Sequence, residues 1–411
     1  MHRRSIQLTL ACLFVAISQI SVLAQDFKLW NRTVQVHGFA SQGFVYSSGN
    51  NWLTMNSTSG SAGFTDFGIN MSSPLTDKLR VGAQLYDRNL GQLGQYHPSL
   101  DWGGVDYRFK NWLGIRAGKV KTTLGLYNDS QDLDCLHVFA LLPQGIYPVD
   151  LRDTGIAHTG ADLYGNISLG RRFGEISYTA FAGHHSDSIY SGFAYSSSQD
   201  GVMFRSIEGP QYGGDLRWNT PVKGLLIGAS RMNEKITGKG SFMNPLFVPQ
   251  PIPYRMSTEA YWRNQFYSQF KWRRLELAAE YRRYFNRFPC LPGSDVSTDA
   301  RSWYVSGSYR IGKHLSVGSY YSHYTVTEVS GGIAALFIPT QTDTSLPRNH
   351  VYDKVVAARV DLNRYLYVKI EGHFMDGYGI GPFPNGFYPQ QNPKGFAPNT
   401  NALVVKTGFH F

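Results

Sequence analysis

Hydrophobic and polar residues alternate along much of this chain. In residues 79–86, every second residue from Leu79 to Leu85 is apolar, and Arg80, Gly82 and Gln84 lie between them. Successive side chains of a strand point to opposite faces, so this pattern predicts a strand with one apolar and one polar face. The alternation recurs in residues 66–71, 275–282, 366–374 and 403–411. An all-β fold is therefore expected.

Sixteen strands are predicted from this periodicity. They cover residues 34–46, 63–72, 79–88, 101–110, 113–121, 154–168, 174–185, 211–220, 224–234, 258–272, 275–285, 300–310, 314–325, 350–361, 365–376 and 401–411. The connections between them alternate between short turns of a few residues and long loops such as 47–62, 122–153, 186–210, 235–257 and 286–299. Short turns at one end and long loops at the other are typical of a transmembrane antiparallel β-barrel, with periplasmic turns and external loops.

Lipid explains why such a sheet must close. The bilayer core offers no hydrogen-bond partners to the N–H and C=O groups of an edge strand, so a sheet spans it only as a closed barrel. The apolar faces then point outward and the polar faces line a lumen wide enough for water. Aromatic residues near strand ends, among them Trp112, Trp218 and Trp272, suit the two girdles of a barrel at the level of the lipid headgroups.

The composition excludes two other classes of protein. The chain has 26 Tyr, 25 Phe and 8 Trp, and only 17% of its residues are charged, which is unlike a disordered protein. A membrane-spanning helix needs about 20 apolar residues in a row, and no such run follows residue 24. A helical membrane bundle is therefore excluded as well.

Residues 1–24 are predicted to be a signal peptide. Arg3 and Arg4 precede a mostly apolar stretch over residues 8–22, and Ala24 ends a segment suited to cleavage. The mature chain, residues 25–411, is then a single barrel exported through the periplasm to the outer membrane. Its formal net charge is +8, against +10 for all 411 residues, because the segment carries two arginines.

Three cysteines raise separate questions. Acylation of Cys12, as in a lipoprotein, is disfavoured because little apolar sequence precedes it. Cys135 and Cys290 remain in a compartment that permits disulfides. Their spacing fits no zinc or redox pattern, so one long-range bridge and two free thiols stay open as alternatives.

Because the apolar faces point outward, the residues of the polar faces are predicted to line the pore. The predicted basic lining comprises Arg80, Arg116, Lys119, Lys121, Arg217, Arg263, Arg282, Arg359 and Lys369. Acidic wall positions are fewer and include Asp66, Glu280 and Glu371. A wall with more Arg and Lys lowers the cost of entry for anions, although pairing between neighbouring strands would weaken that preference.

The longest predicted connection, residues 122–153, differs from the others. It contains an apolar stretch at residues 138–143, which would be exposed in a loop surrounded by water. We therefore expect the loop to fold into the lumen; the alternative is an external loop packed on its neighbours. Its acidic residues would then face the basic wall across a constriction: Asp129, Asp132, Asp134, Asp150 and Asp153.

Several short motifs resemble a known family. They are His37-Gly38-Phe39, Gly118 to Tyr127, Arg152-Asp153-Thr154-Gly155 and Lys369 to His373, with Phe411 at the end of the chain. Together they resemble Gram-negative outer-membrane porins of the phosphate-selective and related sixteen-stranded group. That resemblance implies a homotrimer, a third loop inside the pore, passive uptake of small hydrophilic solutes, and a terminal Phe411 presented to the barrel-insertion machinery. The acidic third loop departs from the Arg and Lys ladder of the phosphate-selective members, so a broader porin or a channel for small organic anions fits better.

Other functions find less support in the sequence. A hydrolase on a barrel would need a nucleophile beside a base, and the candidates are His184, His185, Asp187 and Ser188, or Ser302 with His323. No Gly-x-Ser-x-Gly elbow accompanies them. Few residues precede the first strand, so no plug is expected, and the scattered basic residues argue against nucleic acid binding. We expect no catalytic residues, metal or cofactor, and contact with membrane lipid.

Overall fold

The computed structural model of this chain describes residues 25–29, 32–245, 248–291, 294–332, 335, 340–379 and 385–411. The predicted signal peptide, residues 1–24, lies outside the described residues. Among the described residues, no helix is both long and apolar enough to span a bilayer.

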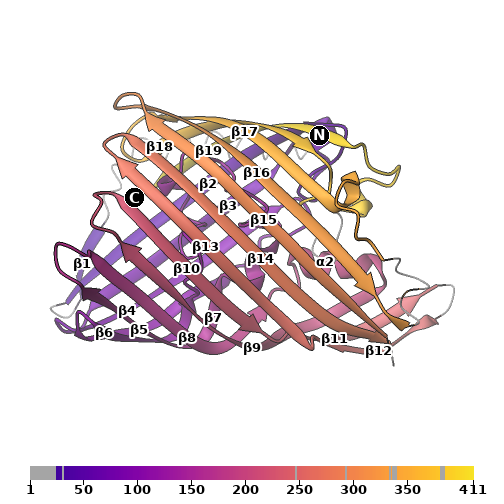
Figure 1. The fold of residues 1–411 in the computed structure, drawn as a ribbon, viewed down its shortest axis with the longest axis horizontal. Coiled ribbons are helices and arrows are strands. Elements are labelled where there is room, and N and C mark those ends of the chain that lie inside the picture. The colour runs from indigo at the N-terminus through magenta and orange to yellow at the C-terminus, as the bar shows by residue number, and fades with distance from the viewer. Residues whose placement is uncertain are drawn as a thin grey trace.

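One antiparallel sheet closes on itself (Figure 1). Its strands are β1 (Gln25–Leu29), β2 (Arg32–Ser48), β3 (Ser61–Pro74), β4 (Leu79–Leu90), β5 (Ser99–Lys110), β6 (Leu113–Lys121), β7 (Ala157–Ser168), β8 (Glu175–Asp187), β9 (Val202–Asn219), β10 (Leu225–Glu234), β11 (Thr237–Asn244), β12 (Val248–Ser257), β13 (Ala260–Trp272), β14 (Leu275–Leu291), β15 (Ser294–Arg310), β16 (Leu315–Ser330), β17 (His350–Asp361), β18 (Leu366–Asp376) and β19 (Asn399–His410). The ring closes where β19 pairs with β2.

The barrel has sixteen strands because four of the segments form two long interrupted ones. Both β10 and β11 pair with β9, and β12 leads into β13 across two residues. The short β1 folds back on β2. The predicted fold, a closed antiparallel barrel of about sixteen strands, is confirmed.

The helical segments are short and lie in the connections. They are α2 (Gly192–Gln199) and the 3-10 turns Ser57–Ser59, Asp134–Leu136, Val149–Thr154, Pro347–Asn349 and Pro389–Gln391. The side chain of Ser191 caps α2 by accepting a hydrogen bond from the backbone N–H of Ala194. This helix joins β8 to β9 at the end of the barrel that carries the long loops, here called the loop end.

The outward faces are the predicted apolar ones. On β14, Leu277 is 43% exposed, whereas its neighbour Glu280 on the other face is 3% exposed. On β3, Phe67, Ile69 and Met71 are likewise exposed and Asp66 is buried. The barrel thus has an apolar exterior and a polar interior, the reverse of a water-soluble sandwich.

Three segments expected as long loops contain strand. Residues 286–299 are mostly the ends of β14 and β15, 235–257 hold the β11–β12 hairpin, and the strand expected at 211–220 begins at Val202. Beyond the membrane the pairing partners on either side are still present, so the ladder continues and satisfies more backbone groups. The seven short connections, residues 75–78, 111–112, 169–174, 220–224, 273–274, 311–314 and 362–365, define the turn end.

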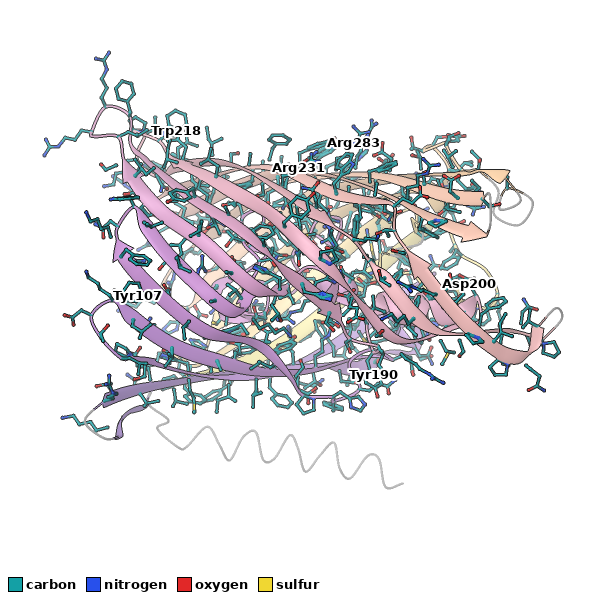
Figure 2. All side chains as sticks on the ribbon, turned by 90° about the horizontal axis from the view of Figure 1, so that it is seen from below. Tyr107, Tyr190, Asp200, Trp218, Arg231 and Arg283 are labelled. Carbon is teal, nitrogen blue, oxygen red and sulfur yellow. The ribbon has the colours of Figure 1, made fainter. Side chains whose placement is uncertain are left out.

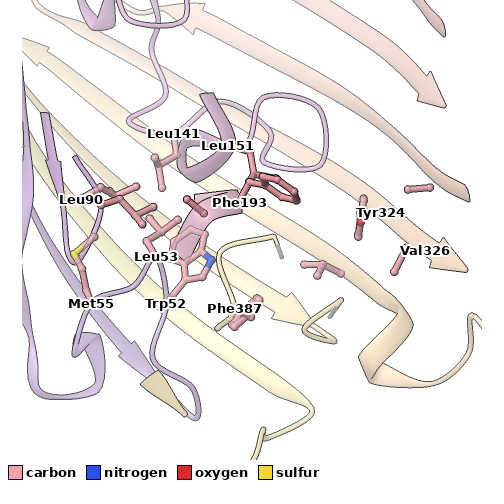
Figure 3. Close-up of a cluster of buried hydrophobic side chains, with 14 of the residues drawn as sticks. Trp52, Leu53, Met55, Leu90, Leu141, Leu151, Phe193, Tyr324, Val326 and Phe387 are labelled. Carbon is pink, nitrogen blue, oxygen red and sulfur yellow. The ribbon is translucent and has the colours of Figure 1, made fainter. Parts of the chain in front are cut away.

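A hydrophobic cluster fills the barrel toward the loop end. Figure 3 shows Trp52 and Leu53 meeting Leu141, Phe193 and Phe387 inside the ring of strands. These residues come from four different connections, and each is 5% exposed or less. Connections that enter the barrel thereby bury apolar side chains that water would otherwise surround.

Candidate pore and the lumen loop

Residues 122–156, the connection from β6 to β7, cross the barrel interior and are called the lumen loop here. The guanidinium of Arg88 on β4 donates to the carbonyl oxygen of Val149, and that of Arg282 on β14 donates to the carbonyl oxygens of Gly145 (2.7 Å) and Ile146. In the strand order, β4 and β14 are on opposite sides of the ring. The loop therefore bridges the lumen from wall to wall.

Basic wall residues satisfy the carbonyl groups of this loop. Arg263 donates to the carbonyl of Thr154 (2.8 Å) and Arg217 to that of Gly125 (2.9 Å). Lys369 donates to the carbonyls of Asp134 and Phe139, both at 2.7 Å, and Arg359 donates to that of His137 (3.0 Å). Irregular backbone inside a barrel has no ladder partners, so these side chains take the place of a neighbouring strand.

Acidic wall residues do the same for N–H groups. Glu371 accepts hydrogen bonds from the backbone N–H of Ala140 (2.7 Å) and Leu141 (3.3 Å), which lie within the predicted apolar stretch. Glu280 accepts from the N–H of Leu126 (3.1 Å) and from the hydroxyl of Tyr147 (2.7 Å). Charges of both signs therefore hold the loop in place.

Asp134 of the loop is paired with two lysines of the barrel wall. Its carboxylate lies 2.9 Å from the ammonium nitrogen of Lys369 and 3.5 Å from that of Lys406, and the hydroxyl of Tyr367 donates to it. Burial by itself would raise the pKa of Asp134, but the two lysines outweigh it and hold the pKa at about 2. This carboxylate is ionised, and the two lysines balance its charge.

A second group of ion pairs connects the lumen loop to β4, β5 and β6. Asp132 pairs with Lys121 and lies 3.7 Å from Arg152, which in turn binds Asp101 of β5 at 2.7 Å. The amide of Gln84 also donates to Asp132. Asp153 pairs with Arg88 at 3.3 Å. The expected acids and bases are thus in direct contact and do not face each other across open space, which reduces the transverse field they produce.

Asp150 is placed differently from the other loop acids. It is fully buried and accepts hydrogen bonds from the backbone N–H of Gly386 (3.0 Å) and the hydroxyl of Tyr388 (2.7 Å), both in the connection from β18 to β19. Burial raises the pKa of Asp150 to about 6, against the effect of these hydrogen bonds. Asp150 therefore fastens a second connection to the lumen loop. Asp129 is half-buried on the same loop.

The remaining predicted basic residues lie away from the loop backbone. Arg80 is exposed and donates to Gln35 (3.0 Å), and Arg116 lies 3.7 Å from Asp162. Lys119 donates to the carbonyl of Leu100 in β5 (2.6 Å).

Two residues of the site were missed in the sequence. Arg88 has the same parity as Arg80 and Gln84, so the alternation that pointed to Arg80 also indicated Arg88. Asp101 gave no such signal, because the pairing of β4 with β5 shifts register between Gln84 and Leu85. The shift brings Asp101 to the inner face.

Of the cavities that lie along the lumen loop, two of about 40 Å³ each have arginine or lysine on their lining. The first is called the arginine cavity. Its described lining has no Asp or Glu and includes Arg152, Arg263 and Arg282, with the neutral residues Gln144, Gln265, Tyr261, Tyr284, Tyr324 and Asn385 among others. The second, the mixed cavity, is lined by Asp66, Asp132, Asp134, Arg152 and Lys406 among others. A cavity of this size holds a few water molecules.

The residues considered for catalysis are not assembled into a hydrolytic site. Ser302 is buried on the inner face of β15, whereas His323 stacks on Trp303 and Tyr352. Trp303 follows Ser302 directly, so its side chain and His323 are on the opposite face. His185 contacts Asp187 of the same strand at 3.1 Å. No group of three or more His, Cys, Asp or Glu suited to a metal occurs among the described residues.

Cys135 carries a free thiol. Its carbonyl accepts from Arg359, near the turn end of β17, whereas residue 290 is at the loop end of β14. The side chain of Cys290 lies outside the described residues. Cys135 therefore takes no part in the disulfide bridge that the sequence left open.

Solved structures with the same architecture were found by comparison. In-vitro folded OmpT, an outer membrane protein of Vibrio cholerae, superposes with a TM-score of 0.58 at 12% identity over 94% of this chain and 100% of that chain. An anion-selective porin from Comamonas acidovorans gives 0.54 at 12% identity, covering 92% and 100% of the two chains. The outer membrane channel DcaP of Acinetobacter baumannii gives 0.53 at 12%, covering 95% and 100%.

The fold is that of the sixteen-stranded outer-membrane porins. Such a barrel, apolar outside and polar inside, belongs in the outer membrane of a Gram-negative envelope. No family model and no curated protein matches the sequence. At these identities the likeness shows the fold alone.

Proposed function

We propose that the protein is a passive diffusion channel for small hydrophilic solutes across the outer membrane, and that it prefers anions. The observation that carries the proposal is the arginine cavity, a water-sized space between the lumen loop and the wall with three guanidinium groups and, among the described residues, no carboxylate on its lining. Arg152 is paired with Asp101, so the excess positive charge comes from Arg263 and Arg282. A cationic lining lowers the electrostatic cost of admitting an anion.

Arg282 contributes most to this preference. Among the described residues it has no carboxylate within 4.0 Å; its hydrogen bonds go to the carbonyls of Gly145 and Ile146. Arg263 is 3.9 Å from Glu234, at the limit of an ion pair. Neutral carbonyls fix the position of a guanidinium and leave its charge in place, so the field extends into the cavity.

The narrowness of the lumen sets the size of the solute. The loop is held on opposite walls, and the two cavities beside it each admit a few water molecules. The path therefore suits small solutes. A channel specific for small organic anions is the nearest alternative, because Tyr261, Tyr284 and Tyr324 line the arginine cavity and offer flat apolar surface beside the cations.

Planar-bilayer recording of the purified protein tests the proposal. We expect stepwise ohmic conductance, and a reversal potential in a KCl gradient with the sign of chloride preference. Absence of conductance in lipid would contradict the channel function. Conductance steps with a reversal potential that indicates potassium preference would support the channel and contradict the anion preference. Competition by benzoate against chloride then separates an organic-anion channel, which it blocks, from a general one.

A homotrimer is part of the same proposal. The support is the shared porin fold, and one of the V. cholerae OmpT structures is described as a trimer form. Chemical crosslinking of the native protein in detergent should stop at a three-chain product; a ladder that stops at one chain contradicts it. We also propose that the barrel-insertion machinery recognises the Phe411 end, so that deletion of Phe411 lowers the amount of folded barrel in the outer membrane.

A further inference from the structure

The positive charge of the chain gathers at the turn end. The seven short connections contain eight Lys or Arg residues and a single acid, Asp77. The eight cations, called the turn ring, are Lys78, Arg171, Arg172, Lys223, Arg273, Arg274, Lys313 and Arg364. Six of the seven turns carry at least one of them, and Lys110 borders the seventh. Most of the +8 of the mature chain therefore sits in one ring and outside the pore.

The turn ring has no counterions among the residues that the structure describes. All eight side chains are exposed, and none of them forms an ion pair with a described acidic residue. At the loop end, by contrast, Arg287 pairs with Glu259 (3.4 Å) and Asp295 (2.6 Å), and Lys239 pairs with Glu208 (3.3 Å). The field of the turn ring is directed at something outside the protein.

Apolar and aromatic side chains accompany these cations. Phe173 (56% exposed), Val222 (56%), Ile311 (51%) and Leu362 (54%) lie within two residues of a ring cation. The guanidinium groups of Arg172, Arg273 and Arg364 lie over the rings of Phe173, Trp272 and Tyr365 at 5.6, 5.2 and 4.5 Å. A cation held against an interfacial aromatic ring is at the depth of lipid headgroups.

Exposed aromatics continue from the turns onto the barrel wall. Figure 2 labels Tyr107 and Trp218 at the turn end, opposite Asp200 at the loop end. Trp218 is 40% exposed, Trp112 51% and Trp272 55%. Such a girdle marks the edge of the hydrocarbon layer, so the cations just beyond it meet phosphate groups of the adjoining leaflet.

We propose that the turn ring binds the phosphate headgroups of anionic phospholipids in the periplasmic leaflet. The proposal rests on the outer-membrane location in the proposed function and on short turns that face the periplasm, as in other outer-membrane barrels, and not on conduction. An acidic cell-wall polymer would also match the charge, but it would not use the exposed Val222, Ile311 and Leu362 or the cations stacked on interfacial rings. The exposed apolar side chains of the turns favour lipid. Because the cations form a ring, the binding sites for headgroups are distributed around the whole barrel.

Native mass spectrometry of the full-length mature protein tests this proposal. The probe is phosphatidylglycerol against phosphatidylcholine with the same acyl chains. The test variant carries Lys223→Gln, Arg273→Gln, Arg274→Gln and Lys313→Gln, which neutralise three neighbouring turns. Wild type should retain several phosphatidylglycerol molecules and the variant should bind them about tenfold more weakly, because each cation near a charged surface contributes to the attraction. Raising the salt should weaken wild type toward the variant.

A matched control removes the same charge from the loop end. It carries Arg205→Gln, Lys235→Gln, Arg255→Gln and Lys394→Gln, four exposed cations without a described ion pair. The control should retain phosphatidylglycerol like wild type. Equal losses in both variants, or none in either, overturn the proposal. Normal lipid retention together with loss of binding to isolated cell-wall sacculi in the test variant would also overturn it, in favour of the polymer. Bilayer conductance measured on the same samples keeps this outcome separate from failure of the channel.

Discussion

The arginine cavity and the mixed cavity both hold cations, but the partners of those cations differ. In the mixed cavity, Lys406 lies 3.0 Å from Asp66 and 3.5 Å from Asp134, so its charge is balanced where it stands. In the arginine cavity, Arg282 is held by two neutral carbonyls. The first arrangement cancels the field and the second preserves it. Lumen charge therefore depends on what each cation is bound to as well as on how many cations there are.

Removing the anchor on the mixed side should have the largest effect. Lys369→Met leaves Asp134 buried with only Lys406 beside it and leaves two loop carbonyls without their donor. Breaking a buried pair from one side costs about 3–5 kcal/mol in the free energy of unfolding. Urea unfolding followed by tryptophan fluorescence measures this cost, and single-channel conductance should rise as the loop loosens.

Lys354→Met is the control for that experiment. Lys354 is exposed on β17, the strand next to β18, and its loss removes no contact of the lumen loop. Unfolding and conductance should both stay at wild-type values. Equal effects of the two substitutions would mean that Lys369 does not anchor the loop.

Removing one cation from the arginine cavity should have the next largest effect. A screened charge at contact distance contributes about 1 kcal/mol in a water-like dielectric, so Arg282→Gln should reduce the chloride-to-potassium permeability ratio by about fivefold. Reversal potentials in a KCl gradient give this ratio directly. Arg231→Gln, on the exposed outer face of β10, should leave it unchanged. An unaltered ratio in Arg282→Gln would remove the arginine cavity from the permeation path.

Acid should tighten the contact at Asp150. The pKa of this carboxyl is about 6 when buried, against 3.8 for an unperturbed Asp, so the protonated form is the one that the docked connection favours. Its contribution to docking is fully present below pH 3.8 and is lost as the pH rises through about 6. Tyr388 and Gly386 contact the carboxyl, and Arg88 is the cation whose field acts on it.

The measurement is single-channel conductance between these two pH values. Wild type should conduct less at the acid end, when residues 385–391 are held most firmly against the lumen loop. Asp150→Asn, which stays neutral, should flatten this dependence. A dependence that persists in Asp150→Asn would assign it to another group.

Asp66→Asn should have the smallest effect, and it changes the mixed cavity instead of the arginine cavity. Lys406 keeps Asp134 at 3.5 Å after the change, so only part of its charge is released into the mixed cavity. We expect a small shift of the reversal potential toward chloride. A shift as large as that of Arg282→Gln in the opposite direction would show that the two cavities contribute equally to selectivity.

Much of the fold could be predicted from the sequence because a barrel in lipid leaves its mark on every strand. One face meets hydrocarbon and the other meets water, so the period-two pattern at residues 79–86 or 275–282 is strong and local. Strand ends at the loop end were less predictable. Beyond the membrane the outward face is no longer forced to be apolar. At the loop end β14 and β15 therefore extend without the alternation of apolar and polar residues that marks their halves near the turn end.

The chain by itself determined which side chains face the lumen wherever a strand is regular, because that depends on parity along one strand; Asp101, at the register shift between β4 and β5, is an exception. Only the tertiary structure decided what those side chains do there. Arg263, Arg282 and Lys369 all have the inward parity, yet their partners lie more than a hundred residues away on the lumen loop. Whether a cation meets a carboxylate or a carbonyl is set by the path of that loop across the barrel, which no local pattern records. The net charge and the cations of the short turns are likewise readable from the sequence, whereas the lack of counterions around those cations, among the described residues, appears only in the structure.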